Sequence, residues 1–460
     1  MIELMGWIVT TAALGLSGMD APTPHRHLVI APERFRESLR AYCDHRTKAS
    51  PHLESFEFVT LERALSLESG RDDAERLKRF LFTRWKEGRL TSCLLVGDCD
   101  TLPMRSMTLD RGTAPAFHWA FYPCDLYYGD VADANGSFDD WNGRTDGFHA
   151  DYWGEVHGET NKDGVINADR VDYDPELAIG RWPVSTPEEC AAVAAKTIAF
   201  ERATSGKDAT RPIAAFFAVG GWVDVRGRIA ALGERMSGSH EVAVHLHDTP
   251  NGSPPNEESM KAVLARHPRF VFHTGHGQPW GYEGCLSLKT IKGIPPGPAQ
   301  PIYFSVGCST AEVMTQAPYQ PYVDIFGTEH AGTNAGEVFT APPPPPAVYQ
   351  SGPRNTTSIA ETLVRVADGG AVAAIGCDTG SQPCAVTLLD GFVETIAAKG
   401  ELTLGDAWVE AIRHYRTAER LTELVPTADW YPPSIFFQGM KFVVLGDPAL
   451  RLAAVPLSGP

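Results

Sequence analysis

Short apolar runs alternate with stretches of helical periodicity over the first hundred residues. Residues 27–30, 56–59 and 93–98 are apolar runs of strand length. Between them, apolar positions recur at helical spacing over residues 35–42 and 74–85. This β-α-β-α-β order predicts a parallel sheet with helices packed against it.

The same alternation returns beyond residue 185. Several of these apolar runs are followed closely by glycine, which is typical of buried parallel strands. The predicted strands are residues 213–219, 242–246, 269–272, 302–306 and 371–375, and the predicted helices are residues 188–202, 225–236, 259–265 and 361–366. Ligand-binding and catalytic groups in such sheets lie just past the carboxyl ends of the strands.

Two stretches lack this periodicity. Residues 122–174 are rich in Asp, Asn, Gly and aromatic side chains, and we interpret them as a long structured loop region. Residues 318–355 contain five consecutive prolines at 342–346, a stiff and extended run without backbone donors. We interpret the second stretch as a surface insertion.

The pattern therefore predicts an α/β protein with two α/β subdomains and mainly parallel sheets. Residues 1–25 form a leader or a disordered N-terminus. Residues 26–205 form the first subdomain. Residues 206–455 form the second, which carries the proline-rich insertion 318–355.

Composition and charge exclude some classes of function. The formal net charge is −17 at pH 7, and a nucleic-acid binder usually needs a basic face to neutralise phosphates. An acidic surface also does not favour anionic lipid, whereas it keeps a protein soluble and can attract basic substrates. The negative charge leads us to expect no nucleic-acid binding. No apolar run approaches about 18 residues, so we also expect no membrane span.

The N-terminus and the cysteines leave the compartment open. Residues 6–18 have the length and apolarity of the hydrophobic region of a signal peptide, but Glu3 precedes them and no Lys or Arg does. We favour a secreted or periplasmic protein over a cytoplasmic one. The nine cysteines show no CxxC pair and no zinc-ligand spacing. Their odd number leaves at least one thiol free in a monomer, and a free thiol can be a nucleophile.

Two strand ends carry the candidate chemistry. Residues 269–272 lead into a turn that contains His276 and Gly277, and residues 302–306 lead into Cys308. If these strands are parallel neighbours, both side chains lie at the same edge of the sheet. An imidazole beside a cysteine promotes the nucleophilic thiolate. The amides of Gly277 and Cys308 would then offer N–H groups to a developing oxyanion.

Each residue also has a structural interpretation. A cysteine at a strand end is more often a small core residue, and a single His-Gly pair is common. The two together on adjacent strand ends favour catalysis. A serine hydrolase is disfavoured because no GxSxG elbow ends a strand, and a dinucleotide-binding enzyme is disfavoured because no GxGxxG follows one.

The sequence His-Thr-Gly-His276-Gly277, followed by Val-Gly-Cys308, resembles the gingipain-like cysteine peptidase family of the caspase and legumain clan. Five more segments are similar to family segments and occur in the same order over about residues 26–452: residues 94–98, 178–184, 369–376, 404–407 and 445–448. The resemblance implies a caspase-hemoglobinase-like fold whose first subdomain is non-catalytic and whose second holds His276 and Cys308.

The resemblance also implies a reaction. A member of this family would be an endopeptidase that cleaves protein or peptide substrates through an acyl-enzyme. His276 would be the general base or thiolate partner and would then protonate the leaving amine. This chemistry needs no metal or other cofactor. The resemblance also fits export of the protein from the cytoplasm.

The sequence departs from the family at the residue that orients the histidine. The family's acidic residue aligns with Val219, which accepts no hydrogen bond, and Asp224 is a nearby candidate to replace it. The acidic residue of the family's S1 pocket has no clear counterpart, so the P1 preference stays open. A catalytically inactive gingipain-like binding or scaffold protein is the alternative, which Val219 favours and the intact His276 and Cys308 oppose.

The Asp- and Asn-rich region offers a candidate cation site. Asp133, Asn135, Asn161 and Asp163 are alternating oxygen ligands near glycine, a pattern suited to calcium, although no twelve-residue EF-hand loop is complete. Asx turns at the surface are the alternative interpretation. The resemblance adds weight to structural calcium, because gingipain catalytic domains hold it.

Overall fold

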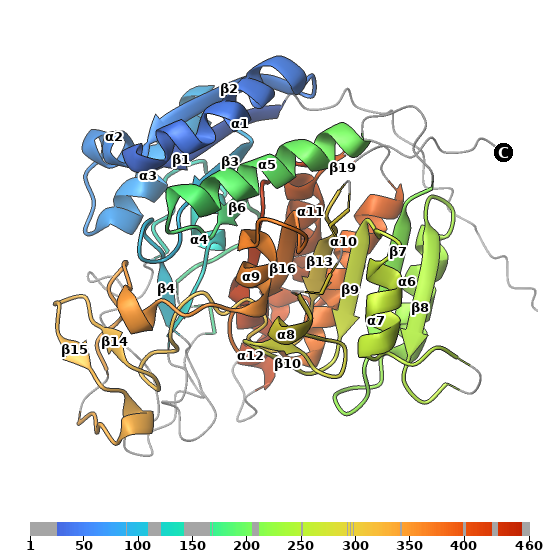
Figure 1. Cartoon of the computed structure of the whole chain (residues 1–460). Helices are drawn as coiled ribbons and strands as arrows, with labels where there is room; N and C mark the ends of the chain where they lie inside the picture. The colour runs from blue at the N-terminus through green and yellow to red at the C-terminus, as the bar shows by residue number, and fades with distance from the viewer. Residues whose placement is uncertain are drawn as a thin grey trace, which may run out of the picture.

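The computed structural model describes most of the chain (Figure 1). The described residues are 25–88, 90–108, 121–141, 166–167, 169–204, 211–249, 252–291, 293–294, 296–297, 299–340, 343–398, 402–425 and 431–452. Within them, ten strands form one sheet in the order β2-β1-β3-β6-β18-β16-β13-β9-β7-β8. In that order, the strands are Leu53–Thr60, His25–Ala31, Ser92–Val96, Ala178–Trp182, Phe442–Leu445, Ala373–Cys377, Ile302–Ser305, Phe270–Thr274, Ile213–Ala218 and Glu241–Leu246.

The sheet consists of two parallel blocks. Strands β2, β1, β3, β6 and β18 are parallel to one another, and so are β16, β13, β9, β7 and β8. The blocks meet where β18 pairs antiparallel with β16. The carboxyl ends of the second block, which include those of β9 and β13, therefore share one edge of the sheet. The α/β class with mainly parallel pairing is as the sequence predicted.

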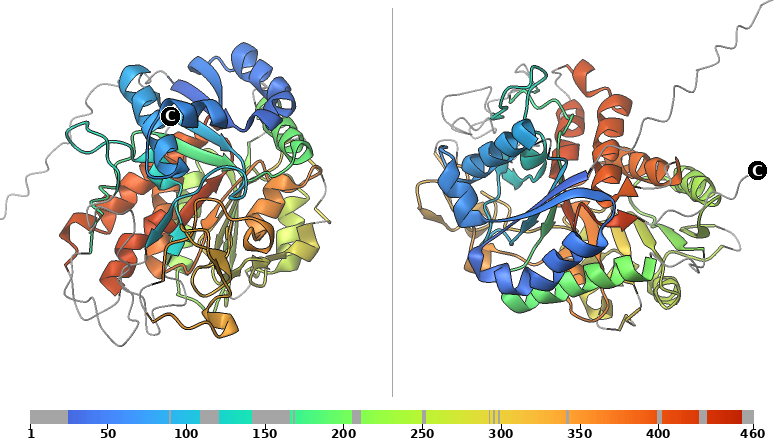
Figure 2. Two further views of the ribbon diagram at one scale, coloured as in Figure 1. Left: turned by 90° about the vertical axis from the view of Figure 1, so that its left-hand side faces the viewer. Right: turned by 90° about the horizontal axis from the view of Figure 1, so that it is seen from above.

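Helices cover both faces of the sheet (Figure 2). Two consecutive residues of β7 show why. The side chain of Phe216 is buried in the hydrophobic core on one face of the sheet, and that of Phe217 is buried in the core on the other face. Strands buried on both faces are apolar without alternation, which is the pattern that the sequence showed.

Two layers of helices pack on these faces. On the face of Phe216 lie α2 (Leu61–Leu67), α3 (Asp73–Gly88), α4 (Leu126–Gly129), α6 (Arg226–Met236), α10 (Val386–Ala398), α11 (Leu404–Ala418) and α12 (Tyr431–Gln438). On the face of Phe217 lie α1 (Arg36–Ala49), α5 (Pro187–Thr204), α7 (Glu257–Leu264), α8 (Leu288–Ile291) and α9 (Ile359–Arg365). Shorter strands pair outside the sheet: β4 (Ser106–Thr108) with β5 (Phe121–Pro123), β10 (Gly277–Gln278) with β11 (Gly281–Tyr282), β11 with β12 (Leu286–Ser287), β14 (Tyr322–Val323) with β15 (Glu329–His330), and β17 (Leu402–Thr403) with β19 (Arg451–Leu452).

A buried charge network joins the N-terminal helices to the end of β18. Asp447 accepts hydrogen bonds from Arg46 and, at 2.6 Å, from the Tyr42 hydroxyl, and Arg46 also pairs with Glu201 at 2.7 Å. The side chains of Arg46 and Asp447 are fully buried. Burial is the largest single influence on the pKa of Asp447 and would raise it. The charges of Arg46 and His27 and the hydrogen bonds from Tyr42 and Arg46 together outweigh burial and lower that pKa below its usual value. The network therefore connects α1, α5 and the C-terminal segment of the sheet.

The proline-rich insertion packs against the first half of the chain. The backbone amide of Gln350 donates to the carbonyl oxygen of Cys99 at 3.1 Å, and the Tyr349 hydroxyl donates to the Asp73 carboxylate at 3.0 Å. Inside the insertion, His330 lies between Asp324 at 3.0 Å and Glu337 at 2.7 Å. The described parts of the insertion, residues 318–340 and 343–355, are thus fixed by side-chain contacts in addition to the stiffness of the proline run.

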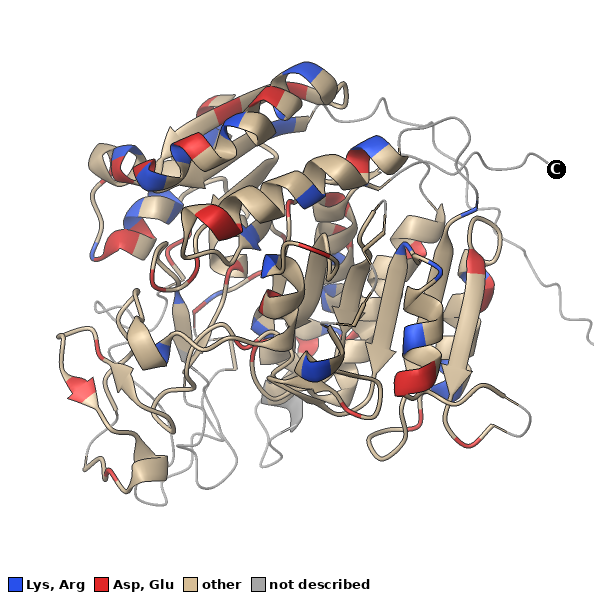
Figure 3. Ribbon diagram, viewed as in Figure 1, with Lys and Arg blue, Asp and Glu red and all other residues tan. Residues whose placement is uncertain are grey.

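Three further features bear on the sequence expectations. All nine cysteines lie in the described residues and carry free thiols. No helix of the described residues is long and apolar enough to cross a bilayer. Basic and acidic residues are interspersed along α1, α2, α3 and α5, so these helices carry no stripe of a single sign (Figure 3).

Candidate active site

The candidate pair lies at equal depth past two neighbouring strands. Strands β9 and β13 are parallel neighbours, as the sequence predicted, and His273 is paired with Ser305 in their register. His276 comes three residues after His273, and Cys308 comes three residues after Ser305. The topology therefore brings the turns that carry His276 and Cys308 to neighbouring positions on the same edge of the sheet.

The backbones of the two turns are in direct contact. A Cβ at Gly277 would lie 2.5 Å from Cγ2 of Thr310 and 2.7 Å from the carbonyl oxygen of Cys308. A Cβ at Gly307 would lie 2.9 Å from the amide nitrogen of Gly277. These distances are too short for any side chain, so both positions require glycine. The close approach places the Gly277 amide beside the Cys308 turn, where the sequence predicted an oxyanion donor.

A backbone carbonyl fixes the ring of His276. The Nε2 atom donates a hydrogen bond to the carbonyl oxygen of Gly221 at 2.8 Å, because that oxygen can only accept. The neutral ring then has a free lone pair on Nδ1, which can take a proton from a thiol. Gly221 follows β7 and has a φ of +91°, a left-handed conformation that glycine adopts without strain.

Asp224 does not orient His276, contrary to the sequence expectation. Its carboxylate is exposed and pairs with the Arg226 guanidinium, with contacts of 2.9 and 2.8 Å. The partner of the imidazole is the carbonyl of Gly221. Val219, at the position of the family's acid, packs against the turn instead: a Cβ at Gly275 would lie 2.8 Å from its Cβ.

The thiol of Cys308 is half-buried and has backbone partners. The Ser381 amide donates to Sγ at 3.3 Å, and the Ser381 carbonyl oxygen lies 3.7 Å from Sγ as an acceptor. Of the nine cysteines, only Cys308 and Cys43 are not buried. Burial raises the pKa of the neighbouring Cys377 thiol to about 12.

Sequence reasoning missed the loop that carries Ser381. This loop follows β16, which the sequence did predict, and its carboxyl end lies at the same edge as those of β9 and β13. No motif marks Ser381, because its backbone rather than its side chain contacts the thiol. The only signal was the position of the loop after a predicted strand.

Two buried carboxyl groups support the Cys308 turn, and the sequence did not single them out. Asp378 is fully buried and accepts hydrogen bonds from the Val313 amide at 3.0 Å and from the Gln316 side chain at 3.2 Å. Glu312 is also buried, and burial raises its pKa to about 7. Asp378 follows β16 and Glu312 follows β13. The Cys308 turn therefore packs against buried polar groups.

His273 has a structural role. Its ring is buried, and Nδ1 lies 2.9 Å from the Ser305 hydroxyl. The ring stacks on Tyr282 with centroids 4.7 Å apart. Burial lowers the pKa of His273 to about 3, so the ring stays neutral and links β9 to β13.

The candidate calcium ligands do not assemble in the described residues. Asp133 is half-buried, and its Oδ1 accepts hydrogen bonds from the amides of Asn135 and Ser137, both at 2.9 Å, which is an Asx turn. Asn161 and Asp163 lie outside the described residues. Among the residues that the structure describes, no group of three or more His, Cys, Asp or Glu side chains is arranged to hold a metal ion. Structural calcium stays a prediction.

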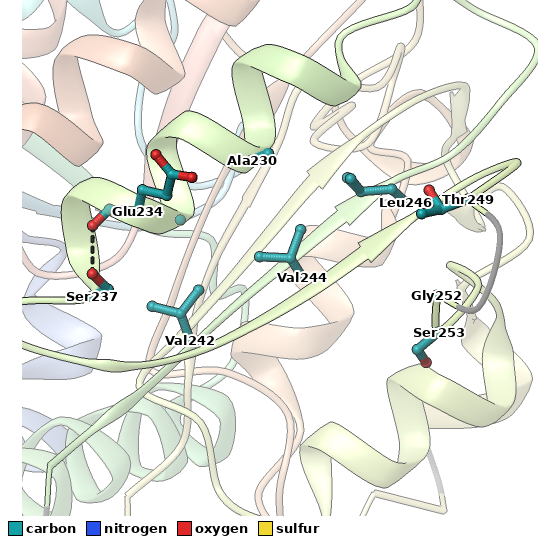
Figure 4. A pocket seen from close by; sticks show the side chains of 10 residues that line it. Ala230, Glu234, Ser237, Val242, Val244, Leu246, Thr249, Gly252 and Ser253 are labelled. Carbon is teal, nitrogen blue, oxygen red and sulfur yellow. Dashed lines mark hydrogen bonds between the residues drawn. The ribbon is translucent and has the colours of Figure 1, made fainter.

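A separate hollow lies between α6 and the edge strand β8 (Figure 4). Its volume is about 410 Å³, and Val242, Val244 and Leu246 form an apolar wall. Its lining residues come from α6, β8 and the segment after β8, and they include neither candidate catalytic turn. This hollow is therefore separate from the site of His276 and Cys308.

Gly277→Ala tests the close contact between the two turns. The added methyl group would overlap the Cys308 carbonyl, so the turns must separate. For the peptidase activity that the resemblance implies, we expect a loss of about 100-fold or more, because a displacement of about 1 Å can have that effect. The measurement is kcat/KM on a fluorogenic peptide, with Gly238→Ala as the control because a Cβ there meets nothing within 4 Å. Equal activity of the two variants would contradict the geometry.

Comparison with known proteins agrees with this geometry. A sequence model of peptidase family C25 matches residues 20–453. The chain therefore belongs to peptidase family C25, the gingipain family of cysteine peptidases. No curated protein sequence matches the chain.

Solved structures agree on the fold. The structure of gingipain R (RgpB), an Arg-specific cysteine proteinase, superposes with a TM-score of 0.60 at 16% identity, and the match covers 94% of this chain and 81% of that one. The complex of the pro- and mature domains of Porphyromonas gingivalis RgpB gives a TM-score of 0.59 at 16% identity, with the same coverage. The protein thus has the α/β, caspase-like fold of the gingipains.

Proposed function

We propose that the protein is an active cysteine endopeptidase that uses His276 and Cys308 to cleave protein substrates through an acyl-enzyme. The observation that carries the proposal is the equal depth of the two residues past paired, parallel strands, with Nε2 of His276 bonded to a carbonyl oxygen. Membership of a cysteine peptidase family supports it independently.

The reaction begins with proton transfer from the Cys308 thiol to Nδ1 of His276. The thiolate then attacks the carbonyl carbon of the scissile peptide bond, and the amides of Gly277 and Cys308 donate to the oxyanion that forms. When the C–N bond breaks, Nδ1 gives its proton to the leaving amine, and a thioester remains on Cys308. Water, deprotonated by the same nitrogen, hydrolyses the thioester and restores the thiol.

A carbonyl can do part of the work of the family's acidic residue. The Gly221 oxygen fixes the tautomer and the ring orientation of His276, which are two roles of the third residue in a catalytic triad. It carries no full negative charge, so it stabilises the imidazolium less than a carboxylate would. The proposed site is therefore a Cys–His dyad with a backbone support.

Alkylation kinetics test the proposal. With limiting iodoacetamide near neutral pH, Cys308 should react faster than the other eight thiols, and His276→Ala should abolish this selectivity. Mass spectrometry of tryptic peptides identifies the labelled sites. Cys43 is the internal reference, because it is the other half-buried thiol. Labelling of Cys308 that is no faster than that of Cys43 would favour the inactive binding or scaffold protein.

A further inference from the structure

A hollow of about 550 Å³ is lined by the two loops that hold the candidate pair. Residues 223–228 line it from one loop, and they begin two residues after Gly221, whose carbonyl oxygen accepts the hydrogen bond from the candidate histidine. Pro383 lines it from the other loop, two residues after Ser381, whose amide donates to the candidate thiol. We call this feature the loop hollow.

The contacts of the two loops place the loop hollow next to the candidate site. The loops follow β7 and β16, and these strands flank β9 and β13 in the order β16-β13-β9-β7. His276 and Cys308 follow the two inner strands, and each is tied to one of the loops by the hydrogen bond described above. A side chain bound in the loop hollow is therefore close to the bond that the proposed reaction cleaves.

Arg228, which lines the loop hollow, is a fixed cation with free donors. Its Nε donates to the Asp390 carboxylate at 2.5 Å, and its Nη2 donates to the Thr387 hydroxyl at 2.9 Å, both on α10. Its Nη1 has no hydrogen-bond partner among the residues that the structure describes, and the side chain is 41% exposed. A guanidinium that is already held through one edge loses little entropy when its other donors bind a carboxylate.

The second arginine of the loop hollow has an exposed carboxylate as its charged partner. The Arg226 guanidinium contacts the Asp224 carboxylate at 2.9 and 2.8 Å, two residues away along the chain. The side chain of Asp224 is 59% exposed. Exposed ion pairs of this kind contribute little to stability, so the carboxylate of a bound substrate can replace that of Asp224.

The lining of the loop hollow disfavours a basic side chain and fits an acidic one. A lysine or arginine side chain would meet two guanidinium groups and one carboxylate that is already paired. An aspartate or glutamate side chain would meet the free Nη1 donors of Arg228. Val223, Val225 and Pro383 add apolar surface for the short aliphatic stem of such a side chain.

We propose that the loop hollow is a substrate subsite that takes an aspartate or glutamate side chain, whose carboxylate binds to Arg228. This inference rests on the proposed peptidase function. The acidic residue lies near the scissile bond, because the loop hollow adjoins the turns of both proposed catalytic residues. Arg226 adds a second positive charge when the incoming carboxylate displaces Asp224.

Cleavage-site mapping tests the subsite. The protein digests a mixed peptide pool, and mass spectrometry counts the residues at each position around every cut. We expect Asp and Glu to be enriched, and Lys and Arg to be depleted, at one position near the cut. Arg228→Gln should lower this enrichment about threefold to tenfold, as expected for the loss of one partly exposed charge-assisted contact.

Two further variants separate recognition from stability. The double variant Arg228→Gln with Asp390→Asn removes both members of the ion pair, so it leaves no unpaired buried carboxylate, and it should lose the enrichment as the single variant does. Asp224→Asn removes the competing carboxylate from Arg226 and should raise the enrichment about twofold. A preference that survives in both Arg228 variants overturns the subsite.

Arg235→Gln is the matched control for the arginine variants. Arg235 lies on the same helix as Arg228 and pairs with Glu394 of α10 at 3.4 Å, but it does not line the loop hollow. This variant should keep the enrichment of the parent protein. Cleavage with no acidic preference near the cut overturns the subsite but not the peptidase.

A binding measurement separates the inference from the proposed function. Fluorescein-labelled decapeptide mixtures with Asp or Asn fixed at one position are titrated against Cys308→Ala protein, and anisotropy is recorded. The net charge of −17 repels acidic peptides at long range, so tighter binding of the Asp mixture reports a local contact. The Asp mixture should bind about threefold to tenfold more tightly, and adding Arg228→Gln should remove the difference.

The two outcomes of this titration are distinct. If no peptide is cut but the preference for Asp holds and depends on Arg228, the peptidase proposal fails and the loop hollow remains a binding site for acidic side chains. Equal binding of both mixtures, or a preference that Arg228→Gln leaves unchanged, overturns the inference.

Discussion

Replacing Cys308 with alanine is expected to reduce peptide cleavage to the uncatalysed rate, and His276→Ala should lower kcat/KM by about 10⁴-fold or more. The nucleophile and its base act as a unit, so the loss of either one removes nearly the whole chemical contribution. The substrate is a fluorogenic peptide that the parent protein cleaves. Because the two side chains act in the same step, the double variant should be no worse than Cys308→Ala alone.

Cys43→Ala is the matched control for this experiment. Cys43 lies in α1, is half-buried like Cys308, and has no place in the proposed mechanism. Its burial raises the pKa of the thiol to about 11, so it is a poor nucleophile at neutral pH. Activity that survives Cys308→Ala but falls in Cys43→Ala would refute the assignment of the nucleophile.

The sequence predicted the strands of the second block because each is buried on both faces. Such strands are continuous apolar runs, and β7, β9 and β13 were all identified within two residues of their observed ends. Helix α10 was missed although it packs against α6 and α11, buries eight of its residues and has the polar residues Asp390 and Glu394 one turn apart. The antiparallel contact of β18 with β16 joins distant segments, and no local pattern encodes it.

The same contrast applies to the candidate site. His276 and Cys308 could be singled out because they are chemically distinctive residues at the ends of predicted strands. Gly221 and Ser381 act through backbone groups, which every residue possesses, so their residue types gave no signal. The expectation for Asp224 failed because a carboxylate pairs with the nearest available guanidinium, and Arg226 is only two residues away.

Asp447→Ala is expected to be the most destabilising of the variants considered. It leaves the buried guanidinium of Arg46 with only Glu201 as a charged partner, and breaking a buried pair from one side typically costs about 3–5 kcal/mol. Urea unfolding at pH 7, followed by circular dichroism, measures the loss. Asp44→Ala removes an exposed carboxylate that pairs with Lys48 on the same helix as Arg46, and it should cost less than about 1 kcal/mol.

The pH dependence distinguishes the charge from simple packing. Because the folded-state pKa of Asp447 is lowered, its contribution is fully present above the unfolded-state pKa and is lost as the pH falls through the folded-state value. The difference in unfolding free energy between parent and Asp447→Ala should therefore shrink on acidification below pH 4, whereas a cavity effect would be independent of pH. A loss equal to that of Asp44→Ala, or one that does not change with pH, would show that the charge of Asp447 does not stabilise the contact of α1 and α5 with the segment after β18.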